Sequence, residues 1–223
     1  MTAPEAILFE GPAGALEGVL TAAPSAASRA PRALAVVSHP HPLYGGDMDN
    51  LVVREAEAAL LAAGVAVLRY NFRGTGRSDG QHDGGVGERS DLEAALGEMT
   101  RRHGHDLPIL LVGYSFGAIV TLTFLADAEL PPAGLAGVLV LAPPVSYFTG
   151  PNWSTAGAPG AIIYGSDDDL TPDPRVREVA VNIGSGIVRE RIAGVGHDLG
   201  TFSDPAALRD ALRRRVAAIV DAI

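Results

Sequence analysis

The feature that most constrains the fold of this chain is an alternation of short apolar runs with longer amphipathic patterns after about residue 30. The apolar runs have the length of buried strands, and the amphipathic patterns have the spacing of helices that pack one face against a sheet. Strands that alternate with helices form a mostly parallel sheet covered by helices on both faces. The chain has 223 residues, so we expect a single domain over residues 1–223.

Two segments before this alternation have a different pattern. Residues 6–10 and 16–22 flank the turn-like run 11–14, which predicts an antiparallel hairpin at one edge of the sheet. With the hairpin the expected sheet has eight strands, the other six being 33–38, 65–70, 108–113, 138–141, 161–164 and 187–192. The expected helices are 50–63, 88–103, 117–127, 175–183 and 204–223.

The composition is that of a globular protein, and it argues against nucleic-acid binding and against any chemistry that uses cysteine. Apolar residues make up 47% and charged residues 19% of the chain, and the net charge is −9. All 17 basic residues are arginines spread along the chain, so a nucleic acid would meet mainly repulsion. The absence of cysteine excludes disulfides, thiolate metal sites and a cysteine nucleophile.

Neither a membrane span nor a secretory signal is evident in the sequence. The longest apolar runs, such as residues 109–112 and 138–142, are far shorter than the roughly 20 residues that cross a bilayer. Residues 1–10 lack the basic start, apolar stretch and cleavage site of a signal peptide. We therefore expect a cytoplasmic protein with no membrane partner, and the sequence indicates no particular oligomeric state.

One motif carries the strongest functional signal. Residues 113–117 read Gly-Tyr-Ser-Phe-Gly and match Gly-x-Ser-x-Gly. An apolar strand precedes the motif and a helical pattern follows it, which places Ser115 on a sharp strand-to-helix turn. The backbone of such a turn is strained, and the flanking glycines keep side chains out of it. We therefore predict that Ser115 is a nucleophile.

A serine hydroxyl needs a general base, and histidine titrates in the right range to serve as one. Of the six histidines, only His197 follows Ser115 in the sequence. It lies in the Gly-rich run 194–198, between the last predicted strand and the last predicted helix. We predict that His197 is the base.

The base needs a carboxylate that holds its tautomer, and in folds with this turn the chain order is serine, acid, histidine. There is no carboxylate between Glu129 and Asp167. The loop after the strand at 161–164 offers three in succession, namely Asp167, Asp168 and Asp169. Order alone leaves the acid as one of these three.

Taken together, these residues resemble the lidless bacterial α/β-hydrolases related to dienelactone hydrolases and small carboxylesterases. The acid loop of that group typically reads Gly-x-x-Asp-x-x-[Thr/Val]-Pro, and residues 165–172 fit this pattern with Asp168 as the acid. The resemblance implies the α/β-hydrolase fold, a mostly parallel eight-stranded sheet with helices on both faces. The stretch between Leu141 and Ala161 is too short for a multi-helix lid, so we expect no cap domain. Dienelactone hydrolases use a cysteine nucleophile, so their substrate is not expected here.

The resemblance also places an oxyanion segment after the third strand, at residues 39–46. Pro40 stands where the family usually has glycine, and proline has no N–H. The backbone N–H of His41 is therefore our predicted oxyanion donor, together with that of Phe116. Residues 71–80 resemble another family loop, for which we expect a structural role.

Two other interpretations of these loops are less favoured. His39 and His41 could bind a metal near Asp47 and Asp49, but two prolines stiffen the segment and no third ligand is evident. We expect His39 to order the loop through a hydrogen bond instead. Residues 74–79 lack the third glycine of a dinucleotide-binding motif. We therefore expect no metal, flavin or nucleotide cofactor.

The predicted function is that of a serine hydrolase that cleaves small acyl esters through a Ser-His-Asp triad and an acyl-enzyme. Tyr44, Phe148 and Trp153 are candidates for the lining of an acyl pocket. A thioesterase, a peptidase or an acyltransferase with the same triad stays open, because fold and triad do not determine the leaving group. A non-catalytic binding protein on a hydrolase fold is the alternative from another class.

Overall fold

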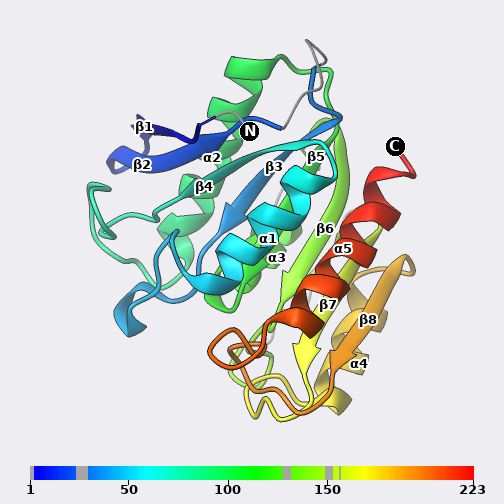
Figure 1. The fold of residues 1–223 in the computed structure, drawn as a ribbon. Helices are drawn as coiled ribbons and strands as arrows, with labels where there is room; N and C mark the ends of the chain where they lie inside the picture. Colours follow the sequence, from blue (N-terminus) through cyan, green and yellow to red (C-terminus); the bar gives the residue numbers. More distant parts are fainter. Residues whose placement is uncertain (1–2, 24–29, 128–131, 149–152, 156) are drawn as a thin grey trace.

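The computed structural model of the protein describes residues 3–23, 30–127, 132–148, 153–155 and 157–223. These residues form one eight-stranded sheet in the order β1-β2-β4-β3-β5-β6-β7-β8, with five α-helices around it (Figure 1). The strands are β1 (Glu5–Gly11), β2 (Gly14–Thr21), β3 (Ala33–Ser38), β4 (Val65–Tyr70), β5 (Ile109–Tyr114), β6 (Leu135–Leu141), β7 (Gly160–Gly165) and β8 (Ile187–Ile192). The α-helices are α1 (Leu51–Ala62), α2 (Val86–His103), α3 (Phe116–Asp127), α4 (Asp173–Ile183) and α5 (Ala206–Val220).

The sheet is mostly parallel, as the sequence predicts. The hairpin β1–β2 lies at one edge, where β1 pairs antiparallel with β2 and β2 antiparallel with β4. All other neighbours, from β4 and β3 to β7 and β8, are parallel. The carboxyl ends of the parallel strands therefore meet at one edge of the sheet. The predictions of an α/β-hydrolase fold and of eight strands are confirmed.

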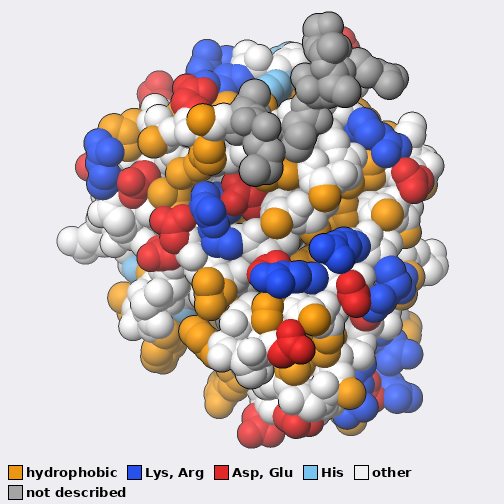
Figure 2. All heavy atoms as spheres, viewed as in Figure 1, with side chains coloured by type: hydrophobic (Ala, Val, Ile, Leu, Met, Phe, Trp, Pro, Cys, Tyr) orange, Lys and Arg blue, Asp and Glu red, His pale blue; other side chains and the backbone are white. Residues whose placement is uncertain are grey.

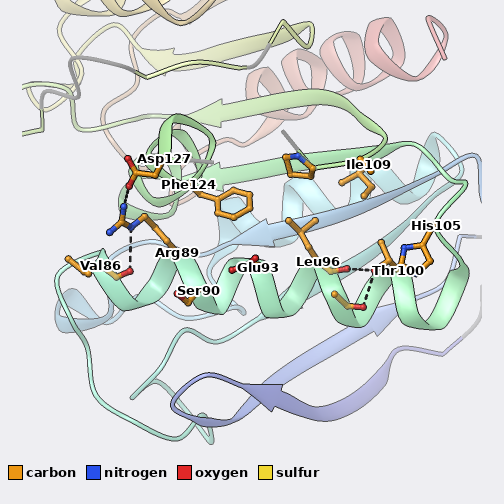
Figure 3. A pocket seen from close by; sticks show the side chains of 13 residues that line it. Val86, Arg89, Ser90, Glu93, Leu96, Thr100, His105, Ile109, Phe124 and Asp127 are labelled. Atoms are coloured by element: carbon orange, nitrogen blue, oxygen red, sulfur yellow. Dashed lines mark hydrogen bonds and ion pairs between the residues drawn. The ribbon is translucent and has the colours of Figure 1, made fainter. Parts of the chain in front are cut away.

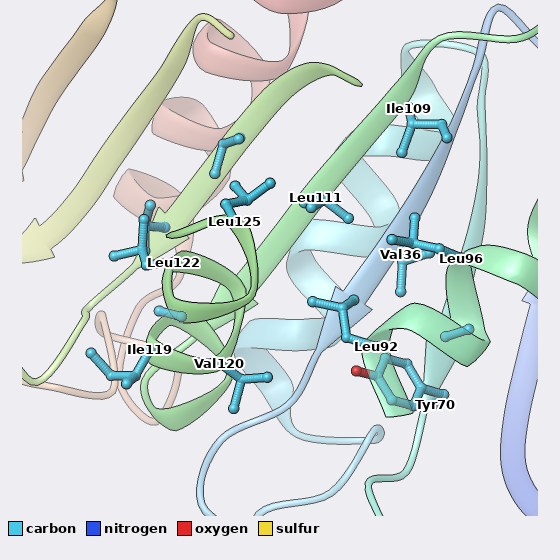
Figure 4. Close-up of a cluster of buried hydrophobic side chains, with 14 of the residues drawn as sticks. Val36, Tyr70, Leu92, Leu96, Ile109, Leu111, Ile119, Val120, Leu122 and Leu125 are labelled. Carbon is cyan, nitrogen blue, oxygen red and sulfur yellow. The ribbon is translucent and has the colours of Figure 1, made fainter. Parts of the chain in front are cut away.

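Helices cover both faces of the sheet, because successive side chains of each buried strand point to opposite sides. Ala35 and Val37 of β3 pack with α1 and α5 on one face. Leu34 and Val36 of the same strand pack with α2, α3 and α4 on the other face. Figure 4 shows part of this second cluster, in which side chains of α2 and α3 meet those of β3 and β5. Both faces are thus closed, which explains why the central strands are apolar throughout.

The face that carries α1 and α5 has interspersed charges. Figure 2 shows arginine and acidic side chains next to one another on this face. One such ion pair joins α5 to α1, with 2.6 Å between Arg209 and Glu55. Within the ranges given above, no helix has the length and apolarity to cross a bilayer.

The element bounds differ from the predicted ones by a few residues. The helix α2 begins at Val86 rather than at residue 88 because the Glu88 carboxylate accepts hydrogen bonds from the backbone N–H groups of Asp83 and Gly85. The strand β6 begins at Leu135, three residues before the predicted start. Asn50 caps α1 as expected, since its side chain accepts from the N–H of Val52. Element type is correct throughout.

Candidate active site

Ser115 lies on the turn between β5 and α3, at the carboxyl end of the sheet. Its φ is 53°, a left-handed value that is uncommon for a residue other than glycine. A Cβ on Gly113 would lie 2.4 Å from the carbonyl oxygen of Gly117. A Cβ on Gly117 would lie 2.4 Å from the carbonyl oxygen of Ser38, at the end of β3. Both motif glycines are therefore required by close backbone approaches.

The structure brings Ser115, His197 and Asp168 together in one hydrogen-bonded chain. His197 Nε2 lies 2.8 Å from Ser115 Oγ, and His197 Nδ1 lies 2.8 Å from Asp168 Oδ2. A carboxylate beside Nδ1 favours the tautomer with its proton on that nitrogen. Nε2 is then free to accept the proton of the Ser115 hydroxyl.

Asp168 is buried, and its two oxygens are both occupied. Oδ1 accepts a hydrogen bond from the N–H of Leu170 at 2.9 Å, while Oδ2 faces His197. Burial by itself would raise the pKa of Asp168, but the hydrogen bonds and charge of His197 and the bonds from Thr171 and Leu170 hold it below its ordinary value. The carboxylate is therefore ionised at neutral pH and can stabilise an imidazolium.

The neighbouring aspartates point elsewhere. Asp167 and Asp169 are both exposed. The Asp167 carboxylate accepts a hydrogen bond from its neighbour Ser166 at 2.6 Å. Of the three acidic candidates, Asp168 is the one that contacts His197.

The loop that carries His197 is held in place by contacts that sequence reasoning did not identify. The Tyr114 hydroxyl donates to the carbonyl oxygen of His197 at 3.0 Å. A Cβ on Gly165 would lie 2.2 Å from the carbonyl oxygen of Val195, so the acid loop and the histidine loop are in close backbone contact. Tyr114, at an x position of the Gly-x-Ser-x-Gly motif, was the available signal, and it holds the backbone of His197.

The two predicted oxyanion residues lie against one another, and Phe116 directly follows Ser115. Phe116 is the first residue of α3, so its N–H is one that helix geometry leaves without an intrahelical partner. The rings of His41 and Phe116 are 4.8 Å apart between centroids. The segment after β3 is held against α3 by the close approach at Gly117 described above. The role of both N–H groups as oxyanion donors stays a prediction.

Comparisons with known proteins agree with this geometry. The family model described as serine aminopeptidase, S33, a hydrolase family, matches residues 29–158, which is more than half of the chain. The chain belongs to this family of α/β serine hydrolases. The matched range includes Ser115 and ends before Asp168 and His197.

Relatives of this hydrolase occur in several bacteria. An uncharacterized protein of Rickettsia prowazekii is 36% identical over 176 residues, which cover 78% of this chain and 71% of that protein. The crystal structure of an α/β serine hydrolase without a lid from Xanthomonas campestris is 29% identical, with a TM-score of 0.82 and 96% and 94% of the two chains covered. An α/β serine hydrolase homologue from Coxiella burnetii is 31% identical, with a TM-score of 0.79 and coverage of 96% and 98%. The fold of this hydrolase therefore has no lid.

An esterase from Pyrococcus furiosus is also similar in structure, with a TM-score of 0.74 and coverage of 95% and 91%. Its sequence is only 16% identical, so this likeness extends to the fold alone.

His39 has the structural role expected from the sequence. It is fully buried, with Nδ1 2.6 Å from the carbonyl oxygen of Pro40 and Nε2 accepting from the N–H of Phe72 at 3.0 Å. Both ring nitrogens are thus occupied, which argues against the metal-binding alternative. Burial lowers the pKa of His39 to about 4. The neutral imidazole joins the loop after β3 to the loop after β4.

The loop at residues 71–80 of this hydrolase is tied to its surroundings by polar contacts. Asn71 accepts from the N–H of Met48 and donates to Glu17, each at 2.9 Å. Arg73 forms a bidentate ion pair with the buried Asp91 of α2. These contacts support the structural role expected for the loop.

The structure also reveals two side chains near the site that sequence reasoning missed. His82 Nδ1 lies 2.7 Å from Oε1 of the fully buried Glu88. The His82 ring lies 4.7 Å from that of His41 and 5.4 Å from that of Phe116, measured between centroids. His82 lies in the loop before α2 and Glu88 in the first turn of that helix, so their contact depends on the conformation of the turn at residues 83–85.

The three predicted pocket residues lie in different environments. Tyr44 is 87% exposed, and its ring is 4.9 Å from that of His41. Trp153 is buried in the apolar cluster beside α3, and its indole N–H donates to Thr123 at 3.2 Å. Phe148 is half-buried against the same cluster. Tyr44 contacts the site residue His41 through its ring, and a substrate contact of any of the three stays a prediction.

One cavity of the described chain lies away from Ser115, Asp168 and His197. It has a volume of about 830 Å³ and lies between α2 and α3, with Arg89, Glu93 and Phe124 in its wall (Figure 3). An ion pair between Arg89 and Asp127 crosses one end of it. None of Ser115, Asp168 and His197 lines this cavity, so we do not assign the chemistry to it.

Proposed function

We propose that this hydrolase cleaves small carboxylic esters through a covalent acyl-enzyme on Ser115. The observation that carries the proposal is the continuous chain from Ser115 Oγ through the His197 ring to Asp168, with 2.8 Å at each link. A serine on a strained turn, a histidine within hydrogen-bond reach and a carboxylate behind it have the geometry of an activated nucleophile.

The steps follow from the positions of these groups. His197 Nε2 takes the Ser115 proton as Oγ attacks the acyl carbonyl, and Asp168 stabilises the imidazolium that forms. The N–H groups of Phe116 and His41 stabilise the oxyanion, each with a contribution of about 3 kcal/mol. His197 then returns its proton to the leaving alcohol. Water, deprotonated by the same histidine, hydrolyses the acyl-enzyme.

Esters are the first substrate class to test because an alcohol is an easier leaving group than an amine and because a protein of the same fold, from Pyrococcus furiosus, is an esterase. A peptidase activity is the second candidate, since the matching family model is described as a serine aminopeptidase. Rates with nitrophenyl acetate and with aminoacyl nitroanilides distinguish the two. Thioesterase and acyltransferase activities use the same triad and differ in the leaving group or acceptor.

We predict that Ser115→Ala and His197→Ala each lower kcat for nitrophenyl acetate by at least about 10³-fold, because each removes one member of a unit that acts together. Stopped assays on the purified variants, with thermal unfolding as the check on the fold, measure this. The matched control is His105→Ala, which removes an exposed histidine outside the site. Retention of more than a few per cent of the activity in Ser115→Ala would refute the assignment.

A further inference from the structure

A second pairing of a histidine with a buried carboxylate lies beside the proposed active site. His82 Nδ1 faces Oε1 of Glu88 at 2.7 Å, as Nδ1 of His197 faces Asp168. Glu88 is fully buried and also accepts the N–H groups of Asp83 and Gly85, so its position is fixed from three sides. The contact between His82 and Glu88 is close, but it does not have the geometry of an aligned hydrogen bond.

The histidine of this pair is in the wall of a cavity. The cavity has a volume of about 440 Å³ and lies between the segment 42–47 and the segment 74–82. This volume is within the range of small-molecule sites. No hydrogen bond from His82 Nε2 to another described residue is present, and about 15% of the His82 side chain is exposed. The carboxylate at Nδ1 thus leaves Nε2 as an available acceptor.

The cavity lies close to the nucleophile. The His82 ring contacts that of Phe116, the residue next to Ser115, at 5.4 Å between centroids. His41, which precedes the cavity residue Pro42, contacts the same two rings at 4.7 and 4.8 Å. One wall residue of the cavity, His82, is thus in contact with both predicted oxyanion residues.

The chemistry of the wall favours an uncharged, hydroxyl-bearing group. Among the described residues that line the cavity there is no arginine, and Asp47 would repel an anion. The polar side chains are His82, Gln81, Thr75 and Asp47, all of which can accept a hydrogen bond. Thr75 Oγ1 is one of the buried side-chain atoms in the described part that have no hydrogen-bond partner. An unsatisfied polar atom of this kind calls for an explanation, and a bound polar group supplies one.

We propose that this cavity binds a neutral, hydroxyl-bearing part of the ester substrate, with His82 Nε2 accepting a hydrogen bond from the hydroxyl group. The inference rests on the proposed esterase function and adds the substrate class to it. Glu88 acts through His82 by fixing its tautomer and is a positioning residue. The hydroxyl group can belong to the alcohol part of the ester or to the acyl part.

Two pairs of substrates distinguish these sources. Glycerol 1-butyrate is compared with propyl butyrate for the alcohol part, and the nitrophenyl esters of 3-hydroxybutyrate and butyrate are compared for the acyl part. For each pair, kcat/KM of the hydroxyl-bearing ester is divided by kcat/KM of the ester without the hydroxyl group. This ratio is then divided by the corresponding ratio of the rate constants for alkaline hydrolysis, because the hydroxyl group also changes intrinsic reactivity. We expect a corrected preference of about three- to tenfold in one pair, as one hydrogen bond contributes.

Two variants test whether this cavity is the source of the preference. His82→Phe keeps a ring against Phe116 and His41 and removes Nε2, so the corrected ratio is expected to fall to about one. Gln81→Trp places a bulky side chain at an exposed position of the cavity wall, leaves the pair of His82 and Glu88 intact, and is expected to lower the ratio as well. Because Gln81 is exposed, this variant retains the fold even where His82→Phe does not. His105→Phe, at an exposed position outside both sites, is the matched control.

Each outcome has one meaning. A corrected ratio of about one in the wild-type enzyme for both pairs overturns the inference and leaves the esterase proposal standing. A preference that persists in both His82→Phe and Gln81→Trp shows that the hydroxyl group is bound elsewhere. Hydrolysis of none of the four esters overturns the proposed function and this inference with it.

Discussion

Three residues other than glycine have positive φ in the described part of the chain, namely Ser115, Ala142 and Leu199, at 53°, 41° and 54°. Ser115 is the proposed nucleophile, Ala142 directly follows β6, and Leu199 lies two residues after His197. Such conformations cost about 1–3 kcal/mol each and persist where the surroundings enforce them. The N–H of Ser115 donates to the carbonyl oxygen of Leu141, and that of Ala142 to the carbonyl oxygen of Ile163, both at 2.8 Å. These bonds hold two of the three conformations. Strain is thus concentrated around the triad.

The choice of Asp168 as the acid shows how much could be predicted from the sequence for a single residue. Chain order narrowed the choice to three consecutive aspartates, and the family pattern selected Asp168. No property of the side chains themselves distinguishes the three, because the difference arises from burial and from the distance to a loop 29 residues away. Only the packing of the acid loop against the loop that carries His197 distinguishes Asp168 from Asp167 and Asp169.

We predict that Asp168→Asn lowers kcat on nitrophenyl acetate by about 10⁴-fold, since an amide at this position favours the wrong tautomer of the histidine. The exposed neighbours provide matched controls, and Asp167→Asn and Asp169→Asn should each retain most of the activity. Steady-state kinetics on the three variants measure this. Similar losses at all three positions would show that Asp168 does not have this role.

At the scale of the elements, the loops after β3 and β4 depend on one neutral histidine. His39 joins them through the carbonyl oxygen of Pro40 and the N–H of Phe72. Burial lowers its pKa from 6.5 to about 4, so the unfolded chain takes up a proton between these values while the folded chain does not. Unfolding is then accompanied by proton uptake, and the free energy of unfolding falls as the pH falls through this window.

We predict that the His39 imidazole accounts for a loss of about 3 kcal/mol in the free energy of unfolding between pH 7 and pH 4. In His39→Gln, which can still donate to Pro40 and accept from Phe72, the loss over the same range should be smaller by about that amount. Urea unfolding at several pH values, followed by the fluorescence of Trp153, the single tryptophan, measures both proteins. Equal pH dependence in the two proteins would contradict the account.

Much of the element structure was predictable because the central strands are short, apolar and buried on both faces. The predicted strands at 33–38 and 65–70 match the central strands β3 and β4 to the residue, and the edge strand β8 also has its predicted bounds, 187–192. The order of the strands in the sheet was not predictable from local patterns, because it depends on which distant segments pack together and periodicity carries no information on that.

At the scale of the whole molecule, the proposed site lies at the carboxyl edge of a sheet whose fold has no lid. The segment between β6 and β7 contains no helix in its described parts, 142–148, 153–155 and 157–159. The predicted absence of a cap domain is confirmed by the fold. Without a lid there is no large apolar surface that could bury a long acyl chain.

We therefore predict that turnover is highest for short acyl chains and does not rise above the micellar concentration of the substrate. Nitrophenyl esters from two-carbon to sixteen-carbon acyl groups, measured below and above that concentration, test this. A maximum at long chains or a jump in rate at the micellar concentration would show that an apolar surface covers the acyl chain.

The central claim is that Ser115 is a nucleophile activated by His197 and Asp168, and covalent labelling tests it most directly. A fluorophosphonate phosphorylates a serine only when its hydroxyl is activated and an oxyanion site receives the phosphoryl oxygen. The intact mass after labelling should show one adduct per chain, and peptide mapping should place it on Ser115. Ser115→Ala should remain unlabelled, and Asp168→Asn should label far more slowly than Asp167→Asn. An unlabelled wild-type protein, or an adduct on any residue other than Ser115, would contradict the account.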